Sequence, residues 1–231
     1  MHASPRTSPS LAAITITLLA LCVCWDLTGW DLRLAEQFGG PAGFPLRDNW
    51  WLSEVLHSGM RNFAWAITCL LCGLVIWPVG TLRRVPFNRR FQLAIGGVIA
   101  SAAVAIIKSG SHTSCPYDLS AFGGLAQYRS HWLGWTSSDG GGGRCFPAGH
   151  ASVGFAFVTG WFALRRDLPA MARAWLALAV VAGFGLGFVQ QIRGAHFMSH
   201  TLWTGWVCWT VGWVIDLVAN RVGAPQREVV L

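Results

Sequence analysis

The chain has 231 residues, of which 53% are hydrophobic and only 12% charged, about half the charged fraction of a typical soluble domain. This composition, with a mean hydropathy of +0.45 and 14 tryptophans that suit membrane interfaces, argues against a soluble enzyme and predicts an integral membrane protein. The net charge of +7 does not indicate nucleic-acid binding, because the arginines stand in short clusters between apolar runs and not on one soluble face.

Several apolar runs follow one another along the chain, and each predicts a helix that crosses a membrane. A bilayer core of about 30 Å needs roughly 20 helical residues. The first run is interpreted as an uncleaved helix and not as a signal peptide, because no small-x-small cleavage site follows it. We expect an all-α bundle of six transmembrane helices in a single domain, 1–231, with helices at 11–27, 63–82, 91–107, 151–164, 174–192 and 201–219.

A loop of mixed charge separates the first two runs and contains a short amphipathic pattern. Asp48 or Asn49 is expected to cap a helix that runs to Leu56, with Gly59 as its stop. Its apolar face would consist of Trp50, Trp51, Leu52, Val55 and Leu56. We interpret this segment as a helix at the membrane interface, either an anchor or a gate that faces lipid.

Arginines concentrate in two short connectors between the runs. They are Arg83, Arg84, Arg89, Arg90, Arg165, Arg166 and Arg173. The positive-inside rule places these connectors and both termini in the cytoplasm. The long loop between the third and fourth helices, 108–148, then faces outward, which is the periplasm if the membrane is a bacterial inner membrane.

Three histidines stand where polar loops turn into apolar runs on this outer face. His150 follows the sequence Pro-Ala-Gly at 147–149, which is typical of a helix start. The free N–H groups and positive dipole end of such a helix favour anions, phosphate above all. His196 and His200 are four residues apart, so on a helix they share one face and can act on one ligand.

Two cations accompany these histidines. Lys108, the chain's one lysine, ends the third run, and Arg193 ends the fifth. Hydrolysis of a phosphate ester needs cations and N–H donors for the phosphoryl oxygens, a nucleophile, and a proton donor for the leaving oxygen. The two cations and the amide of Gly149 can supply the first set, and the histidines the rest. The sequence therefore predicts a phosphate site at the outer face.

The order and spacing of these residues resemble the type 2 phosphatidic acid phosphatase (PAP2) superfamily of membrane lipid phosphatases, which is related to vanadium haloperoxidases. The family pattern is Lys-x6-Arg-Pro, then Pro-Ser-Gly-His, then Ser-Arg-x5-His-x3-Asp, and the resemblance covers roughly 91–219. The first motif here reads Lys108, six residues, Cys115 and Pro116, so a cysteine stands at the arginine position. In the second motif, Ala148 stands at the serine position.

The third motif also departs from the family pattern. Gln190 stands where the family has arginine, and His200 stands where it has aspartate. Arg193 follows Gln190 by nearly one helical turn and is expected to reach the phosphate instead. The pocket would therefore lack two family donors, the first-motif arginine and the second-motif serine.

The resemblance implies a two-step mechanism that uses no metal and no other cofactor. His196 would attack phosphorus and form a phosphohistidine, while His200 holds it in the right tautomer. His150 would protonate the leaving oxygen and then activate water. The phosphoryl oxygens would be held by Lys108, Arg193, Gly149 and Ala148. The resemblance further implies a phospholipid, an isoprenoid pyrophosphate or a lipid A type phosphate as substrate, and it leaves the oligomeric state open.

Loop residues near the motifs have two interpretations each. Arg144 is either a solvated charge or a contact to the substrate headgroup, and Asp118 either caps a turn or contacts Lys108 and the substrate. Gln190 is a further possible substrate contact. The other histidines of the loops are expected to be ordinary polar groups of the interface, namely His57, His112 and His131.

Two cysteines, Cys115 and Cys145, lie in the outward loop, just after the first motif and just before the second. In an oxidising compartment such cysteines form disulfides. We expect a bridge between them, which would hold the two motifs together and offset the missing arginine.

Three alternatives stay open. A lipid phosphotransferase, or an inactive relative, of the same superfamily would keep the same residues. A non-enzymatic bis-histidine haem or quinone protein would use the paired histidines as ligands, but would leave Lys108 and Arg193 without a role. A metal-dependent hydrolase would use His196 and His200, but the chain lacks the glutamate that zincins carry next to the first histidine.

Overall fold

The computed structural model describes residues 10–222, apart from the side chains of 55–58 and 222, and this part of the chain forms helices and no β-strand. Its α-helices are α1 (Leu11–Thr28), α2 (Trp30–Ala35), α3 (Met60–Ile76), α4 (Phe87–Gly110), α5 (Gly149–Phe155), α6 (Thr159–Leu164), α7 (Pro169–Ile192) and α8 (Met198–Val222). The all-α prediction is confirmed for this range. Both chain ends, which were predicted to be cytoplasmic, lie outside the described residues.

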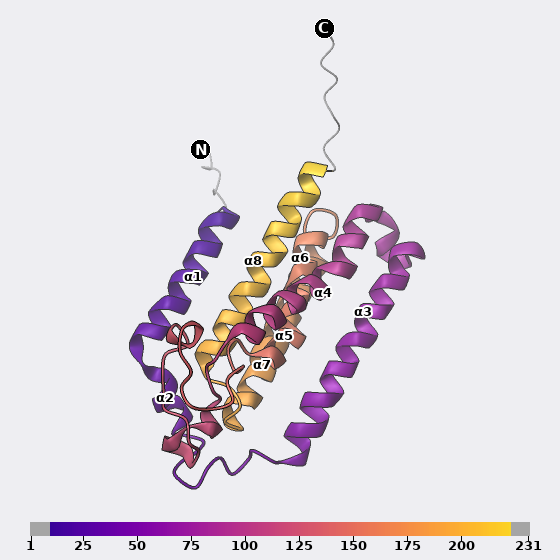
Figure 1. The fold of residues 1–231 in the computed structure, drawn as a ribbon. Helices are drawn as coiled ribbons and strands as arrows, with labels where there is room; N and C mark the ends of the chain where they lie inside the picture. Colours follow the sequence, from indigo (N-terminus) through magenta and orange to yellow (C-terminus); the bar gives the residue numbers. More distant parts are fainter. Residues whose placement is uncertain (1–9, 223–231) are drawn as a thin grey trace, which may run out of the picture.

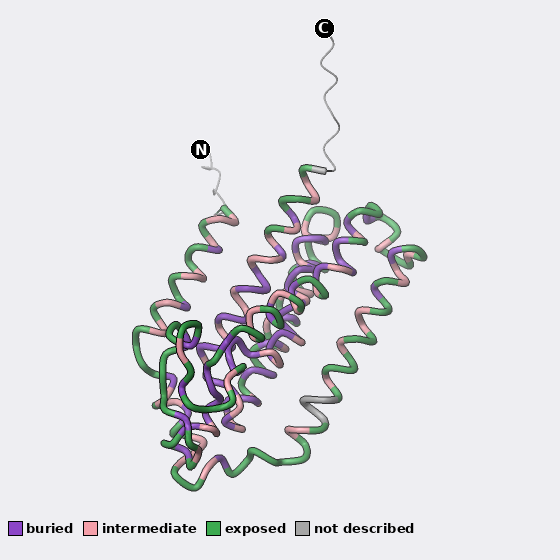
Figure 2. Tube along the Cα trace, viewed as in Figure 1, coloured by how far each residue is buried: buried purple, intermediate pink, exposed green. Residues whose placement is uncertain are grey.

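Helices α4, α7 and α8 form a central bundle with the α5–α6 stretch, while α1 and α3 lie on either side (Figure 1). α1 packs on α8, and α3 packs on α4. Buried residues gather in the central bundle, whereas α1 and α3 are largely exposed (Figure 2). Between α5 and α7 the backbones approach closely, because a Cβ on Gly154 would collide with the backbone of Gly183. Such small-residue contacts are typical of helices that associate in membranes.

Four described helices are long and apolar enough to cross a membrane, namely α1, α4, α7 and α8. The other two predicted spans are apolar but shorter, at Met60–Ile76 and Gly149–Leu164. α3 ends at Ile76 because Pro78 follows, and the fourth stretch is interrupted by a 3₁₀ turn, η6 (Ala156–Val158). By length and composition the structure therefore supports four membrane-spanning helices, and the total of six spans stays a prediction.

The segment before α3 differs from the predicted separate interfacial helix. A π-helix, η1 (Trp51–Gly59), runs directly into α3. Gly59 does not end it, because its φ of −62° and ψ of −48° are ordinary helical values. Trp50 and Trp51 are exposed, which agrees with their expected place at an interface.

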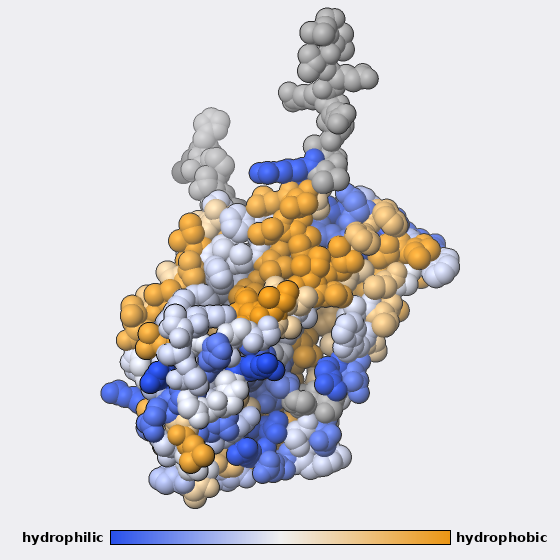
Figure 3. All heavy atoms as spheres, in the orientation of Figure 1, coloured by the Kyte–Doolittle hydropathy of each residue, from blue (hydrophilic) through white to orange (hydrophobic). Residues whose placement is uncertain are grey.

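The long loop folds over the end of the bundle where α4 and α7 finish and α5 and α8 begin (Figure 1). It contains the 3₁₀ turns η3 (Pro116–Asp118), η4 (Ser120–Phe122) and η5 (Leu133–Trp135). Asp139 fixes it from within, accepting the backbone N–H of Ser114 at 2.6 Å and its hydroxyl at 2.7 Å. Hydrophilic residues cover this end, and apolar residues cover the helices beyond it (Figure 3).

A buried polar network ties the opposite end of the bundle together. Asp216 in α8 accepts hydrogen bonds from Arg89 in the first turn of α4 and from Arg165 after α6, each at 2.7 Å. Asn220 also accepts from Arg89. Arg89 was assigned to a connector, but it lies in α4, is 8% exposed and belongs to the core. A lone Asp216 in an apolar run gave no indication of its arginine partners.

Candidate active site

Lys108 and the start of α5 lie together at the loop-covered end. Lys108 stands in the last turn of α4, and Gly149 begins α5. A Cβ built on Gly149 would lie 3.5 Å from Cδ of Lys108 and 3.9 Å from its Nζ. The ammonium group and the first amides of α5 therefore face the same small region, as an anion site needs.

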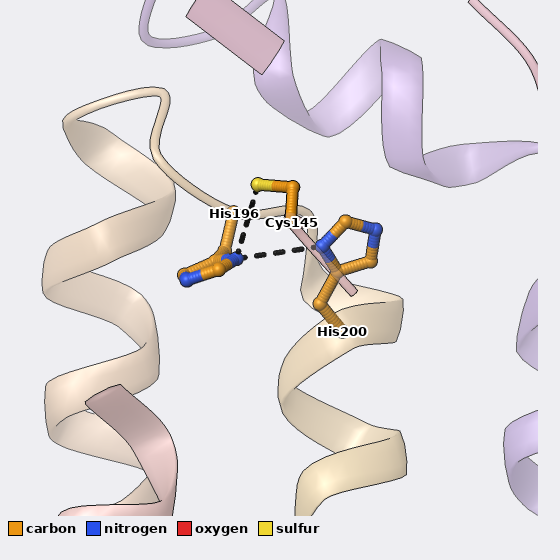
Figure 4. A group of neighbouring side chains, drawn as sticks. All are labelled: Cys145, His196 and His200. Carbon is orange, nitrogen blue, oxygen red and sulfur yellow. Dashed lines mark hydrogen bonds between the residues drawn. The ribbon is translucent and has the colours of Figure 1, made fainter. Parts of the chain in front are cut away.

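The three predicted histidines converge on this region. His196 lies in the turn between α7 and α8, and its ring centroid is 6.0 Å from that of His150 in the first turn of α5. His200, in the first turn of α8, has its Nδ1 atom 3.4 Å from Nδ1 of His196 (Figure 4). His196 and His200 are only 2% and 1% exposed, so the pair is enclosed.

The surroundings of His196 hold its side chain neutral. Burial is the main cause that lowers its pKa well below the ordinary value for histidine, and the positive charge of Lys108 is the second. His200 and His150 lower the pKa of His196 further. A neutral imidazole keeps one nitrogen lone pair, which is what a nucleophile at phosphorus requires.

Ala148 connects the second motif to the third. Its backbone N–H donates to the carbonyl of His200 at 3.2 Å, and the hydroxyl of Thr204 donates to the carbonyls of both residues. The predicted phosphate-binding amide of Ala148 is therefore already engaged within the protein. What it does here is to join the start of α5 to the first turn of α8.

Arg193 points toward a neighbouring loop. Its Nε donates to the carbonyl of Arg47 at 2.9 Å, and its Nη1 lies 3.4 Å from Oε1 of Gln190. Gln190 is 1% exposed and thus packs inside the bundle. The guanidinium of Arg47 lies 4.1 Å above the ring of Tyr117. These contacts place Arg193 among loop residues, while Lys108 is the cation beside the histidines.

The other two predicted contacts lie in the loop. Arg144 is exposed with a φ of 55°, and its backbone N–H bonds the carbonyl of Ser111. Burial is the main cause that raises the pKa of Asp118, and the nearby charge of Arg47 partly offsets it. The nearby charge of Asp139 adds to the rise, and a contact of Asp118 with Lys108 stays a prediction.

Cys115 and Cys145 are joined by a disulfide whose Cα atoms are 5.2 Å apart. The bridge links the segment after α4 to the segment before α5. Sγ of Cys145 lies 3.4 Å from Nδ1 of His196 (Figure 4) and 2.9 Å from the carbonyl oxygen of Ala195. The disulfide therefore forms part of the wall around His196.

The carboxylate of Asp26, to which the sequence assigned no role, lies next to His131, which packs against His200. Oδ2 of Asp26, in the last turn of α1, accepts the indole N–H groups of Trp203 at 2.9 Å and Trp132 at 3.1 Å. It also lies 3.4 Å from Nε2 of His131. His131 packs edge-on against His200, with ring centroids 6.2 Å apart. Contrary to the expectation of an ordinary interfacial group, His131 is buried between an acid and the histidine pair.

A second early acid, Asp31 in α2, fixes the first turn of α8. Its Oδ1 accepts the backbone N–H of Ser199 at 3.0 Å and the indole N–H of Trp25 at 2.8 Å. An acidic side chain at a helix N-terminus satisfies free N–H groups and the positive dipole end. Burial is the main cause that raises the pKa of Asp31. The one sequence signal for both acids was their position directly after a tryptophan next to the first span.

These features define a helical membrane-associated protein with a histidine and lysine site suited to phosphoryl chemistry. The model of the PAP2 superfamily matches residues 91–223, more than half of the chain, so the chain belongs to that superfamily, whose members are phosphatases and phosphoesterases. No curated protein and no solved structure matches the chain. The matched region holds all three motifs, whereas Asp26 and Asp31 precede it.

Proposed function

We propose that this protein is a membrane phosphatase that hydrolyses a lipid phosphate or pyrophosphate monoester through a phosphohistidine on His196. The observation that carries the proposal is the convergence of three histidines beside Lys108 and the start of α5. In this proposal the chain crosses a bacterial inner membrane six times. Its termini are cytoplasmic and its site faces the periplasm. This orientation follows from the distribution of arginines.

The facing Nδ1 atoms restrict the tautomers of His196 and His200. Two nitrogens 3.4 Å apart can share a hydrogen only if one donates and the other accepts. When Nδ1–H of His196 donates to His200, the lone pair of His196 lies on Nε2, free to attack. His200, a neutral acceptor, then performs the orienting role that an aspartate has in the family pattern.

The first chemical step transfers the phosphoryl group. Nε2 of His196 forms a bond to phosphorus while the bond from phosphorus to the leaving oxygen breaks. His150, protonated at this stage, gives its proton to that oxygen. Lys108 and the amide of Gly149 stabilise the charge that develops on the other phosphoryl oxygens.

The second step releases phosphate. His150, now neutral, takes a proton from water, and the hydroxide oxygen forms a bond to phosphorus. The bond between phosphorus and Nε2 breaks, and the lone pair returns to His196. The balance is one water consumed, with one alcohol (or lipid monophosphate) and one phosphate released, and both histidines return to their starting states.

An apolar groove supports a lipid as the substrate. A cavity of about 390 Å³ lies between α3, α4 and α5, and its lining is mostly apolar. Gly149 lines it at the candidate phosphate site, and Arg61 lines it at the start of α3. A hydrocarbon chain in this groove would leave its phosphate beside Lys108.

The test is phosphate release from a panel of lipid phosphates and pyrophosphates with EDTA present. We expect release by the wild type, with a loss of at least about a thousandfold in His196→Ala because the nucleophile is gone. His112→Ala is the matched control, since His112 is an exposed histidine of the long loop between α4 and α5. Equal release by wild type and His196→Ala would refute the proposal. Transfer to an added alcohol in place of water would favour the phosphotransferase.

A further inference from the structure

The sulfur of Cys145 lies against the histidine pair. Sγ is 3.4 Å from Nδ1 of His196, which is 3.4 Å from Nδ1 of His200 (Figure 4), and each of the three side chains offers one ligand atom within 4.8 Å of the other two. The three side chains are buried and come from the loop before α5, the turn before α8 and the first turn of α8. Among the residues that the structure describes, they form the one group with the spacing of metal ligands.

We propose that the Cys115–Cys145 disulfide keeps a divalent metal out of this site, and that its reduction creates a Zn²⁺ site on Cys145, His196 and His200 that switches the nucleophile off. In the bridged form, Sγ of Cys145 is bonded to Cys115 and cannot be a thiolate. Thiolates, and not disulfide sulfurs, are metal ligands. Two imidazoles alone make a weak site, so the bridge removes the ligand that would complete it.

The distances suit zinc. With Zn–N of about 2.0–2.1 Å and Zn–S of about 2.3 Å, a tetrahedral site needs ligand atoms about 3.3–3.6 Å apart. The pairs Cys145–His196 and His196–His200 are already 3.4 Å apart. The third pair, Cys145–His200, offers ligand atoms within 4.8 Å of each other, so this distance must close by at most about 1.5 Å. Water would take the fourth position.

The protons explain why zinc would stop the chemistry. A dithiol reductant breaks the disulfide, becomes a disulfide itself, and leaves thiols on Cys115 and Cys145. On binding Zn²⁺, Cys145 releases its thiol proton to solvent. The proton on Nδ1 of His196 moves to Nε2 so that Nδ1 can bind the metal. Nε2 then has no lone pair for phosphorus, so one bound zinc removes the proposed nucleophile.

Two single variants separate the sulfur ligand from the bridge. Cys115→Ser and Cys145→Ser both lose the disulfide, but only Cys115→Ser keeps the Cys145 thiol. Both are made in a background with Cys69→Ser and Cys72→Ser, because those exposed cysteines form a C-x-x-C pair that can bind zinc itself. The full chain is purified in detergent, stripped with EDTA, incubated with Zn²⁺ alone and analysed for metal.

We expect about one zinc per chain in Cys115→Ser, bound at least about tenfold more tightly than in Cys145→Ser or in the oxidised background protein. The background protein, reduced with a dithiol that is removed before zinc is added, should behave like Cys115→Ser. It serves as the second measurement if that variant fails to fold. Cobalt should give a thiolate-to-metal absorption band with Cys115→Ser that Cys145→Ser lacks. Equal zinc binding by both variants, or no zinc in the reduced background protein, overturns the proposal.

The link to activity rests on the proposed function and is measured separately. Zinc should suppress phosphate release by Cys115→Ser at least about tenfold, and EDTA should restore it. Release by Cys145→Ser should not change with zinc. If no preparation releases phosphate, the proposed function fails while the metal analysis still decides the zinc site. If zinc binds only with the Cys145 thiol but leaves phosphate release unchanged, the inhibitory part of the proposal is wrong.

Discussion

The Nδ1 atoms of His196 and His200 face each other at 3.4 Å inside the protein, one at the end of a turn and the other in the first turn of α8. The family pattern has an aspartate at the second position, which would accept the same hydrogen with a negative charge. Here the neutral ring of His200 accepts the hydrogen on Nδ1 of His196. The orientation of His196 is kept, but the negative charge that an aspartate would supply is missing.

We therefore predict that His200→Asp keeps or raises phosphate release, while His200→Ala lowers it about 10²–10⁴-fold. A carboxylate would stabilise the protonated form of His196 and so raise its pKa. The protonated, inactive form would then persist to higher pH, and the acid limb of kcat/KM would move upward. A pH–rate profile of the three proteins checks this prediction. An acid limb of His200→Asp at the wild-type pH would contradict it.

The charge of Lys108 should also set the position of the acid limb of kcat/KM, because it acts on the pKa of His196. Its charge, after burial, is the second cause that lowers the pKa of His196. Lys108→Met removes that charge, so the pKa of His196 should rise and the acid limb should move to higher pH. Phosphate binding should weaken as well, which would raise KM. Arg144→Met, at an exposed loop arginine, is the control and should leave the limb unchanged.

The pKa of His196 also predicts how stability depends on pH. The folded protein binds a proton at His196 less readily than the unfolded chain, in which the pKa is about 6.5. The contribution of His196 to the free energy of unfolding is therefore complete above that pH and is lost as the pH falls below it. Thermal unfolding in detergent should show a midpoint that drops from pH 7 to pH 5 more in wild type than in His196→Gln. The same drop in both proteins would assign it to other groups.

Asp26 and His131 should act on the rate through His200. Asp26 holds His131 and two indoles, and His131 packs edge-on against His200. We expect Asp26→Asn and His131→Phe to lower kcat with little change in KM, because neither side chain is placed to touch phosphate. His131→Phe keeps the ring that stacks on Phe146, so a loss in this variant would report the lost nitrogen and not lost packing. Unchanged kcat in both variants would show that the pair has only a structural role.

The motifs could be predicted from the sequence because each depends on local spacing. Lys108 ends an apolar run, His150 opens one, and His196 and His200 are one helical turn apart. The length of the apolar runs likewise placed the long helices. The end of α3 before Pro78 and the 3₁₀ turn after Phe155 shorten two of the predicted spans. The first follows from a proline that the sequence shows, whereas the second depends on packing that composition does not reveal.

Long-range polar pairs were beyond the reach of the sequence. Asp26 meets Trp203 across 177 positions, and Arg89 meets Asp216 across 127. A single acid in an apolar stretch gives no sign of its partner, because the partner lies in another element far along the chain. The contact of Arg193 with Arg47 was beyond prediction for the same reason, since the two residues are 146 positions apart and lie in different loops.

Asp216 should be important for stability. It accepts hydrogen bonds from Arg89 and Arg165 in a place where Asp216 is 1% exposed. Asp216→Asn leaves Arg89, Arg165 and Arg166 without their counter-charge, and breaking a buried ion pair costs about 3–5 kcal/mol. The thermal unfolding midpoint in detergent should fall clearly. Asp167→Asn, at an exposed acid of the adjacent connector, should leave it within error. Equal midpoints for all three proteins would contradict the importance of the network.

Filling the apolar groove between α3, α4 and α5 should weaken lipid binding without affecting the phosphate chemistry. Ser101 of α4 lines the groove away from the histidines, and Ser101→Trp would fill part of its volume of about 390 Å³. We expect KM for a long-chain lipid phosphate to rise at least about tenfold, since burying each CH₂ contributes about 0.8 kcal/mol. Hydrolysis of a small soluble aryl phosphate should not change, because Lys108 and the histidines are untouched. If both substrates slow equally, the groove serves the fold of the site and not the hydrocarbon chain.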